Sequence, residues 1–209
     1  MELGLPQQAR VHKMVPKSKF FEKAVVNTKL KREFIDKIQK IYWEYKLAPD
    51  TIGIPSTEAV EEVQVFHLEL KERSIPKNVL KLIDKSIPYP ILYIFTHHVS
   101  TAYGITLKGA GEERYYFSDW GEDIALKFQG TTLETLYQNL VKAFIKSHDS
   151  PQTDFAIIVQ TDKKRQALEK EIQALKNKIR NEKQFNKKVE LNSQLQHKQA
   201  ELRELGIKS

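Results

Sequence analysis

Cysteine is absent from the 209-residue sequence, and no apolar run approaches the roughly 20 residues that a membrane-spanning helix needs. A chain without cysteine forms no disulfide, no thiolate zinc site and no cysteine nucleophile, and this composition suits a reducing cytosol. The first residues, MELGLPQQARVHK, lack the apolar core of an export signal. We therefore expect a cytoplasmic protein that does not associate with membranes.

The common signatures of cofactor and metal sites are also missing. No phosphate-binding loop, G-x-S-x-G elbow or HExxH motif occurs, and the six histidines have no ligand spacing. The GAGEE segment (109–113) lies between two β-rich runs, so we interpret it as a hairpin turn. We expect neither a cofactor nor a bound metal.

Positive charge is in excess, and it is confined to one end of the chain. The sequence has 34 basic and 27 acidic residues, a net charge of +7. Residues 163–209 contain 13 basic and 6 acidic residues, which leaves 21 of each in residues 1–162. The sequence thus predicts a neutral body and a basic appendage, an asymmetry typical of proteins with nucleic acid or acidic partners.

Apolar spacing predicts an α+β fold. Residues 28–47 place Phe34, Ile38, Ile41, Tyr42 and Tyr45 three and four positions apart, which predicts one helix after an irregular arm at 1–27. Further helices are expected after Pro76 and from residue 131. β-rich runs predict strands at 62–71, 90–98, 100–108 and 114–120, with a short fifth at 124–128. We expect a mostly antiparallel sheet of four or five strands flanked by helices.

The C-terminal region carries two helical seams that differ in phase. Leu168, Ile172, Leu175 and Ile179 are spaced 4, 3 and 4 apart, and a second seam starts at Leu191. Either one helix changes phase, or the chain reverses between residues 180 and 188. Because folding back buries both stripes, we expect a helical hairpin. The predicted organisation is an arm (1–27), an α+β body (28–150) and a basic hairpin appendage (151–209), through which the chain is open to oligomerisation.

Basic residues surround the expected end of this hairpin. They offer a site for several phosphates or for an acidic protein, and two uncharged residues there offer stacking or docking. The candidate binding residues are Lys176, Lys178, Arg180, Lys183, Gln184, Phe185, Lys187 and Lys188. In the alternative interpretation, Phe185 closes the end of a scaffold and the bases are only solvated.

One strand end resembles the E-x-K element of restriction nucleases. Alternation places Glu69 and Lys71 on one face with His67, where a carboxylate and a lysine would hold Mg²⁺ and orient a water. The candidates for a second acid are Glu62, Asp119 and Glu122. The alternatives are an exposed strand face and a nuclease-like fold without activity.

Several blocks of the sequence resemble a prokaryotic family catalogued as domain of unknown function number 4391. They are IYWEYKLAPDTIGIP, EEVQVFHLELK, IDKSIPYPILYIF and LEKEIQALKNKIRNEKQFNKKVELNSQL, and the resemblance runs from Phe20 to Leu205. It implies a gene neighbourhood of DNA methyltransferases and helicases in restriction-type phage-defence loci, and no catalytic residues.

Together these features predict a non-catalytic accessory subunit of a restriction or phage-defence complex. It would dock on a protein partner, a methyltransferase or helicase of the same locus, and contact DNA nonspecifically or another subunit through its basic tail. The alternative function is a divalent-metal nuclease, or a degenerate one, centred on Glu69 and Lys71 with Glu62.

Overall fold

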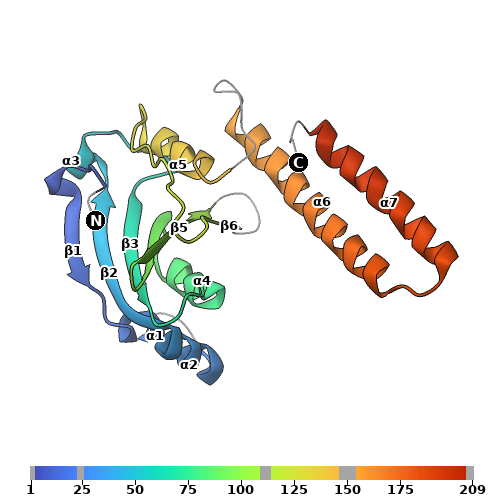
Figure 1. The fold of residues 1–209 in the computed structure, drawn as a ribbon. Coiled ribbons are helices and arrows are strands. Elements are labelled where there is room, and N and C mark those ends of the chain that lie inside the picture. The colour runs from blue at the N-terminus through green and yellow to red at the C-terminus, as the bar shows by residue number, and fades with distance from the viewer. Residues whose placement is uncertain (1–2, 23–25, 109–113, 146–153, 206–209) are drawn as a thin grey trace. The chain divides into compact units, whose positions relative to one another are not determined.

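The computed structural model describes residues 3–22, 26–108, 114–145 and 154–205, and the chain divides into two units, residues 1–144 and 145–209 (Figure 1). We call these units the body and the hairpin unit. The strands of the body are β1 (Arg10–Met14), β2 (Ile38–Leu47), β3 (Val63–Leu70), β4 (Ile91–His97), β5 (Ser100–Leu107) and β6 (Arg114–Phe117). Its helices are η1 (Gln7–Ala9), α1 (Ser18–Glu22), α2 (Thr28–Lys37), α3 (Pro49–Ile52), α4 (Lys77–Ser86) and α5 (Leu133–Lys142).

The six strands form one sheet whose spatial order equals the chain order, β1 to β6. β3 and β4 run parallel, whereas the other four neighbouring pairs are antiparallel. Parallel neighbours need a crossover connection, and α4 lies within the segment that supplies it. The prediction of four or five mostly antiparallel strands is therefore wrong: the sheet is mixed and has six strands.

The extra strands come from segments that the sequence assigned otherwise. Residues 28–47 are not one helix, because α2 ends at Lys37 and residues 38–47 form β2. Two irregularities in the pairing of β2 with β3, between Ile38 and Lys40 and between Trp43 and Tyr45, each insert a residue. Such bulges stretch the two-residue period of a strand, and this produced the apparent helical spacing. The expected arm contributes β1, and residues 124–128 form no strand.

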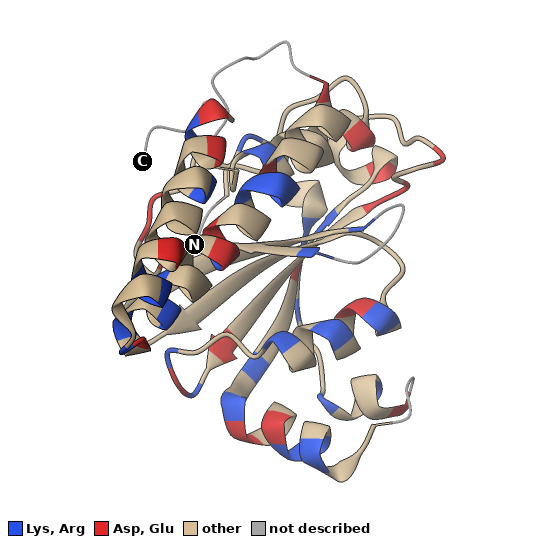
Figure 2. Ribbon diagram, turned by 90° about the vertical axis from the view of Figure 1, so that its right-hand side faces the viewer, with Lys and Arg blue, Asp and Glu red and all other residues tan. Residues whose placement is uncertain are grey.

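Each face of the sheet buries its own apolar cluster, and helices flank both faces (Figure 2). On the first face, which we call the α4 face, strand residues such as Phe66, Leu68 and Phe95 pack with Phe34 of α2 and Leu80 of α4. Side chains one position along each strand point the other way. They form the α5 face, where the buried residues are those of the sheet, such as Val65, Leu92 and Ile105, and of α5, such as Leu136 and Leu140.

The hairpin unit consists of α6 (Phe155–Asn181) and α7 (Phe185–Glu204), which pack together. The prediction of a helical hairpin with a chain reversal between residues 180 and 188 is confirmed. Leu168 and Ile172 of α6 are buried, whereas Leu191, Leu195 and Leu202 of α7 are half-buried. Ion pairs cross between the helices from Lys198 to Glu171 (3.0 Å) and from Lys164 to Glu201 (3.9 Å). The predicted boundary at residues 150–151 and the GAGEE segment lie outside the described residues.

Candidate functional site

Among the described residues of the hairpin unit, ion pairs occur along the shaft, the part of α6 and α7 away from the turn, although Lys163 and Lys170 there form none. On the shaft, Arg165 contacts Asp162 (2.6 Å) and Glu169 (2.7 Å), and Lys198 contacts Glu171 and Glu201. We define the hairpin end as residues 176–188, which hold six basic residues and one acidic residue, net +5. Within the described ranges, none of these six cations forms an ion pair: Lys176, Lys178, Arg180, Lys183, Lys187 and Lys188. Figure 2 shows Lys and Arg in blue on both helices.

The structure brings cations of both helices to one surface at the hairpin end. Lys178 of α6 and Lys187 of α7 line the same open groove of about 550 Å³, together with Asn177, Asn181, Glu182, Glu190 and Leu191. The six basic side chains are all exposed. Their ammonium and guanidinium groups are therefore available to a ligand without breaking a contact within the chain.

The turn between α6 and α7 is held by its single carboxylate. Glu182 Oε1 accepts the backbone N–H groups of Lys183 and Gln184, both at 2.8 Å. These hydrogen bonds lower the pKa of Glu182, and the one from Gln184 has the largest effect. The nearby charges of Lys187 and Lys188 lower the pKa further. Gln184 caps α7 through its backbone position without a side-chain hydrogen bond, so its amide is exposed at the turn.

A second group of polar residues lies on the α5 face, beyond the part that α5 covers. It lines a pocket of about 270 Å³ formed by strands β1 to β4: Arg10, His12, Tyr42, Glu44, Tyr45, His67, Glu69, Ile94 and Thr96. The bulge at Trp43/Tyr45 leaves Glu44 out of the pairing with β3. The backbone of His12 has φ 45°, in the left-handed region that non-glycine residues rarely adopt. Bulges and such conformations often occur beside functional sites.

Close polar contacts and ring stacking connect this pocket across four strands. His12 Nδ1 lies 2.8 Å from Glu44 Oε2, and His67 Nδ1 lies 3.5 Å from Glu44 Oε1. On its other side, His67 Nε2 contacts Thr96 Oγ1 at 2.7 Å. The Tyr42 ring stacks between the two imidazoles, with centroid distances of 5.7 and 5.8 Å. Burial lowers the pKa of His67, and the charge of Glu44 opposes this shift.

Thr96, His67 and Glu44 have the connectivity of a nucleophile, a base and an orienting carboxylate. Acyl transfer also needs donors for a developing oxyanion. Both edges of β4 are hydrogen-bonded to neighbouring strands, and the residue paired with Thr96 on the β3 side is the acid Glu69. A carboxylate at that position opposes negative charge on the reacting group. The arrangement therefore suits a polar network that joins strands better than it suits hydrolysis.

The structure does not assemble the three residues of the nuclease alternative. Glu69 lines the pocket formed by strands β1 to β4, which we call the sheet pocket, and lies 3.9 Å from Lys40. Lys71 Nζ instead donates to the carbonyl oxygen of Ile35 at 2.9 Å. It lies beside Lys17, whose pKa is lowered by burial and then by the charge of Lys71.

Glu62 belongs to a different surface. Its carboxylate contacts Lys46 at 3.0 Å and accepts a hydrogen bond from Gln64 at 2.8 Å. These residues line a separate pocket with Trp43. In the part of the chain that the structure describes, no group of three His, Asp or Glu residues is placed to hold a metal ion. The other candidate acids, Asp119 and Glu122, lie near each other after β6, where Glu122 accepts the Asp119 N–H.

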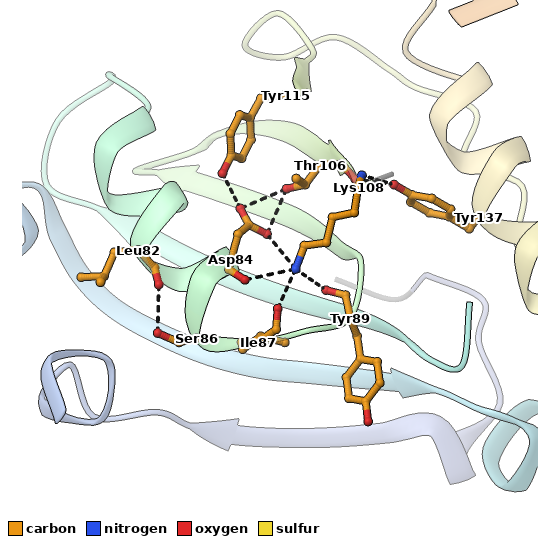
Figure 3. Close-up of polar contacts among 9 residues, drawn as sticks. All are labelled: Leu82, Asp84, Ser86, Ile87, Tyr89, Thr106, Lys108, Tyr115 and Tyr137. Carbon is orange, nitrogen blue, oxygen red and sulfur yellow. Dashed lines mark hydrogen bonds and ion pairs between the residues drawn. The ribbon is translucent and has the colours of Figure 1, made fainter. Parts of the chain in front are cut away.

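A third polar cluster, shown in Figure 3, is buried on the α4 face. Asp84 of α4 has a fully buried side chain that accepts hydrogen bonds from Tyr115 (2.6 Å) and Thr106 (3.1 Å) and lies 3.7 Å from Lys108. Burial raises the pKa of Asp84, whereas Tyr115 and Lys108 oppose the shift.

The Lys108 ammonium also caps the end of α4. It donates to the carbonyl oxygens of Asp84 (3.2 Å), Ile87 (2.6 Å) and Tyr89 (2.9 Å), as Figure 3 shows. A cation at this position satisfies carbonyls that the helix leaves open and complements its dipole. With its groups turned inward onto one another, the cluster anchors α4 to β5.

Sequence reasoning missed the sheet pocket and the buried cluster for different reasons. Glu44 was placed inside a predicted helix, and only the aromatic and β-branched content of IYWEYKL pointed to a strand. Asp84 and Lys108 lie 24 positions apart, and no local pattern connects them. The residues of the hairpin end could be predicted as a candidate site because charge and heptad spacing are local signals.

These observations define an α+β protein with a mixed sheet and a helical hairpin that carries a concentrated positive charge. A model of the family described as "Domain of unknown function (DUF4391)" matches residues 3–202, so the chain belongs to that family. Comparisons with curated proteins and with solved structures found no match. Over the described ranges, no helix has the length and apolar character to cross a membrane.

Proposed function

We propose that this protein is an accessory DNA-binding subunit whose hairpin end holds the phosphate backbone. The observation that carries the proposal is the concentration of cations at the hairpin end: six lie within 13 residues, all exposed, and none forms an ion pair within the described ranges, whereas Arg165, Lys164 and Lys198 of the shaft contact carboxylates. The family resemblance adds the setting: a restriction-type defence complex with a methyltransferase or helicase as protein partner.

The electrostatics set the expected strength of binding. Each phosphate that a cation neutralises releases counterions, so log affinity falls with log salt by a slope of about 0.9 per contact. With roughly three to five contacts, binding is expected to be micromolar or weaker at physiological salt. Such a site adds to the affinity of a complex in which another subunit supplies sequence recognition.

Fluorescence anisotropy with labelled DNA at several salt concentrations tests this proposal. The Lys183/Lys187/Lys188→Glu variant should bind more weakly, with a salt slope shallower by up to about 2.7 for three lost contacts. A matched control, Lys29/Lys81/Lys127→Glu, makes the same charge change at exposed positions of the body. The control should bind far more tightly than the hairpin variant. Equal losses in both variants, or no binding by the wild type at low salt, would contradict the proposal.

A further inference from the structure

Two large apolar side chains are exposed beside the cations of the hairpin end, one in the hairpin end and one directly after it. Phe185 is 78% exposed and Val189 is 53% exposed. They stand four positions apart on α7 and therefore share one face of that helix. Phenylalanine is normally among the most buried residue types, so this exposure has a cost in water that a ligand can relieve. With so much of its ring exposed, Phe185 does not close the hairpin end.

The turn presents Phe185 in a defined way. It is the first residue of α7 and follows directly the two N–H groups that Glu182 accepts. The first intrahelical bond of α7, from Lys188 N to Gln184 O at 3.0 Å, spans it. Because the backbone at Phe185 is already held by this turn, stacking a flat group on its ring costs chiefly the conformational freedom of the side chain itself.

The chemistry that fits both features is a polyanion with exposed aromatic rings. Proteins that bind single strands combine cations along the phosphate backbone with aromatic side chains on which bases stack. A duplex offers the phosphates but keeps its base faces stacked inside. A protein interface of standard size uses about 20–30 residues a side, whereas the large apolar side chains exposed here, among the described residues, are Phe185 and Val189. Charge and exposed ring together favour single-stranded nucleic acid.

We infer that the hairpin end binds single-stranded nucleic acid, with Phe185 stacked on a base and the neighbouring cations on the flanking phosphates. The inference rests on the proposed function, since it names the form of nucleic acid that the same site prefers. It predicts tighter binding of a single strand than of a duplex of equal length, by an amount that depends on the aromatic ring.

The test compares a fluorescein-labelled 20-nucleotide thymidine strand with a 20-base-pair duplex. The Phe185→Ala variant should lose between about 5-fold and about 150-fold in affinity for the strand, the range measured for one stacked base. Its affinity for the duplex should change less than about 2-fold. The matched control is Ile157→Ala, which removes an exposed apolar side chain (55% exposed) from the other end of the hairpin unit and should leave both affinities unchanged.

Two further variants separate stacking from general apolar contact. Phe185→Tyr keeps the ring and should retain strand binding within about 3-fold, whereas Phe185→Leu should bind as weakly as Phe185→Ala. Leucine that restores strand binding would overturn the inference, because general apolar contact rather than stacking of an aromatic ring would then account for it. If the wild type binds both probes and Phe185→Ala does not weaken strand binding more than duplex binding, the inference fails while the proposed function stands. If the wild type binds neither probe, both fail.

Discussion

A single ammonium group, that of Lys108, connects two elements that are distant in the sequence. It lies inside the body, beside a fully buried carboxylate, and donates to three carbonyl oxygens at the end of α4. Removing one partner of a buried pair leaves the other charge without compensation. Lys108 therefore contributes to stability because, without it, the buried carboxylate of Asp84 would lack a compensating charge.

The Lys108→Met variant should lower the free energy of unfolding by about 3–5 kcal/mol, because Asp84 would stay buried without its cation. Urea denaturation followed by circular dichroism measures this loss. The control is Lys85→Met, at an exposed position of α4, the helix that carries Asp84. It should change the free energy of unfolding by less than about 0.5 kcal/mol. Adding Asp84→Asn to Lys108→Met should recover part of the loss, and strict additivity of the two single changes would argue against a coupled pair.

His67 gives the body a dependence on pH. Burial holds its pKa in the folded state below the ordinary value of 6.5. The unfolded chain therefore binds the proton at higher pH, so this contribution to stability is complete above about pH 6.5 and is lost as the pH falls through the folded-state pKa. Glu44 and Glu69 face the imidazole and reduce the effect without reversing it.

The measurement is the urea midpoint of the wild type and of His67→Gln between pH 5 and pH 7.5. The wild type should lose stability on acidification more steeply than the variant. His197→Gln, at an exposed position on α7, serves as the control and should follow the wild type. A wild type that gains stability below pH 6.5 relative to His67→Gln would show that the carboxylates outweigh burial.

Among the elements, β3 carried the nuclease alternative and shows why a strand motif alone is a weak guide. Its bounds were predicted closely, yet the side chain of Lys71 turns back to α2 and Glu62 pairs with Lys46. We therefore expect no cleavage of plasmid DNA in buffer with Mg²⁺ or Mn²⁺. Cleavage that Glu69→Ala abolishes, and that Glu58→Ala at an exposed position leaves intact, would instead establish the nuclease.

The predictable part of the fold depends on how local its signals are. β3, β4, β5, α4 and α5 follow from apolar periodicity that survives in the structure. β2 could not be predicted from apolar periodicity, since its two bulges shift which residues face the core. β1 carries little apolar patterning, being almost entirely exposed, and its place at the sheet edge depends on pairing with β2 rather than on its own sequence. The same limit applies to the pocket around Glu44, because pairing across four strands is a tertiary property.

At the scale of the whole molecule, most of the excess positive charge lies in the hairpin unit: residues 145–209 hold 14 basic and 9 acidic residues, net +5, and residues 1–144 hold 20 and 18, net +2. The region up to residue 162 has equal numbers of acidic and basic residues, and the excess lies in the remaining 47. The change of heptad seam predicted where the chain reverses, and the counts of acidic and basic residues showed where the positive charge lies. The exposure of Phe185 and the unpaired state of the cations needed the structure, since sequence alone left a plugged scaffold and a binding end as equal alternatives.

The agreement between strand order and chain order also has a consequence for how the body folds. Every strand after β1 pairs with its immediate predecessor in the chain, and the longest connections are residues 15–37 and 71–90. The entropy cost of closing such loops grows only with the logarithm of their length, and contacts close in sequence favour fast folding. During synthesis, each strand can add to a sheet edge that has already emerged. The body is therefore expected to gain its sheet progressively from the N-terminal side, with β6 completing it last.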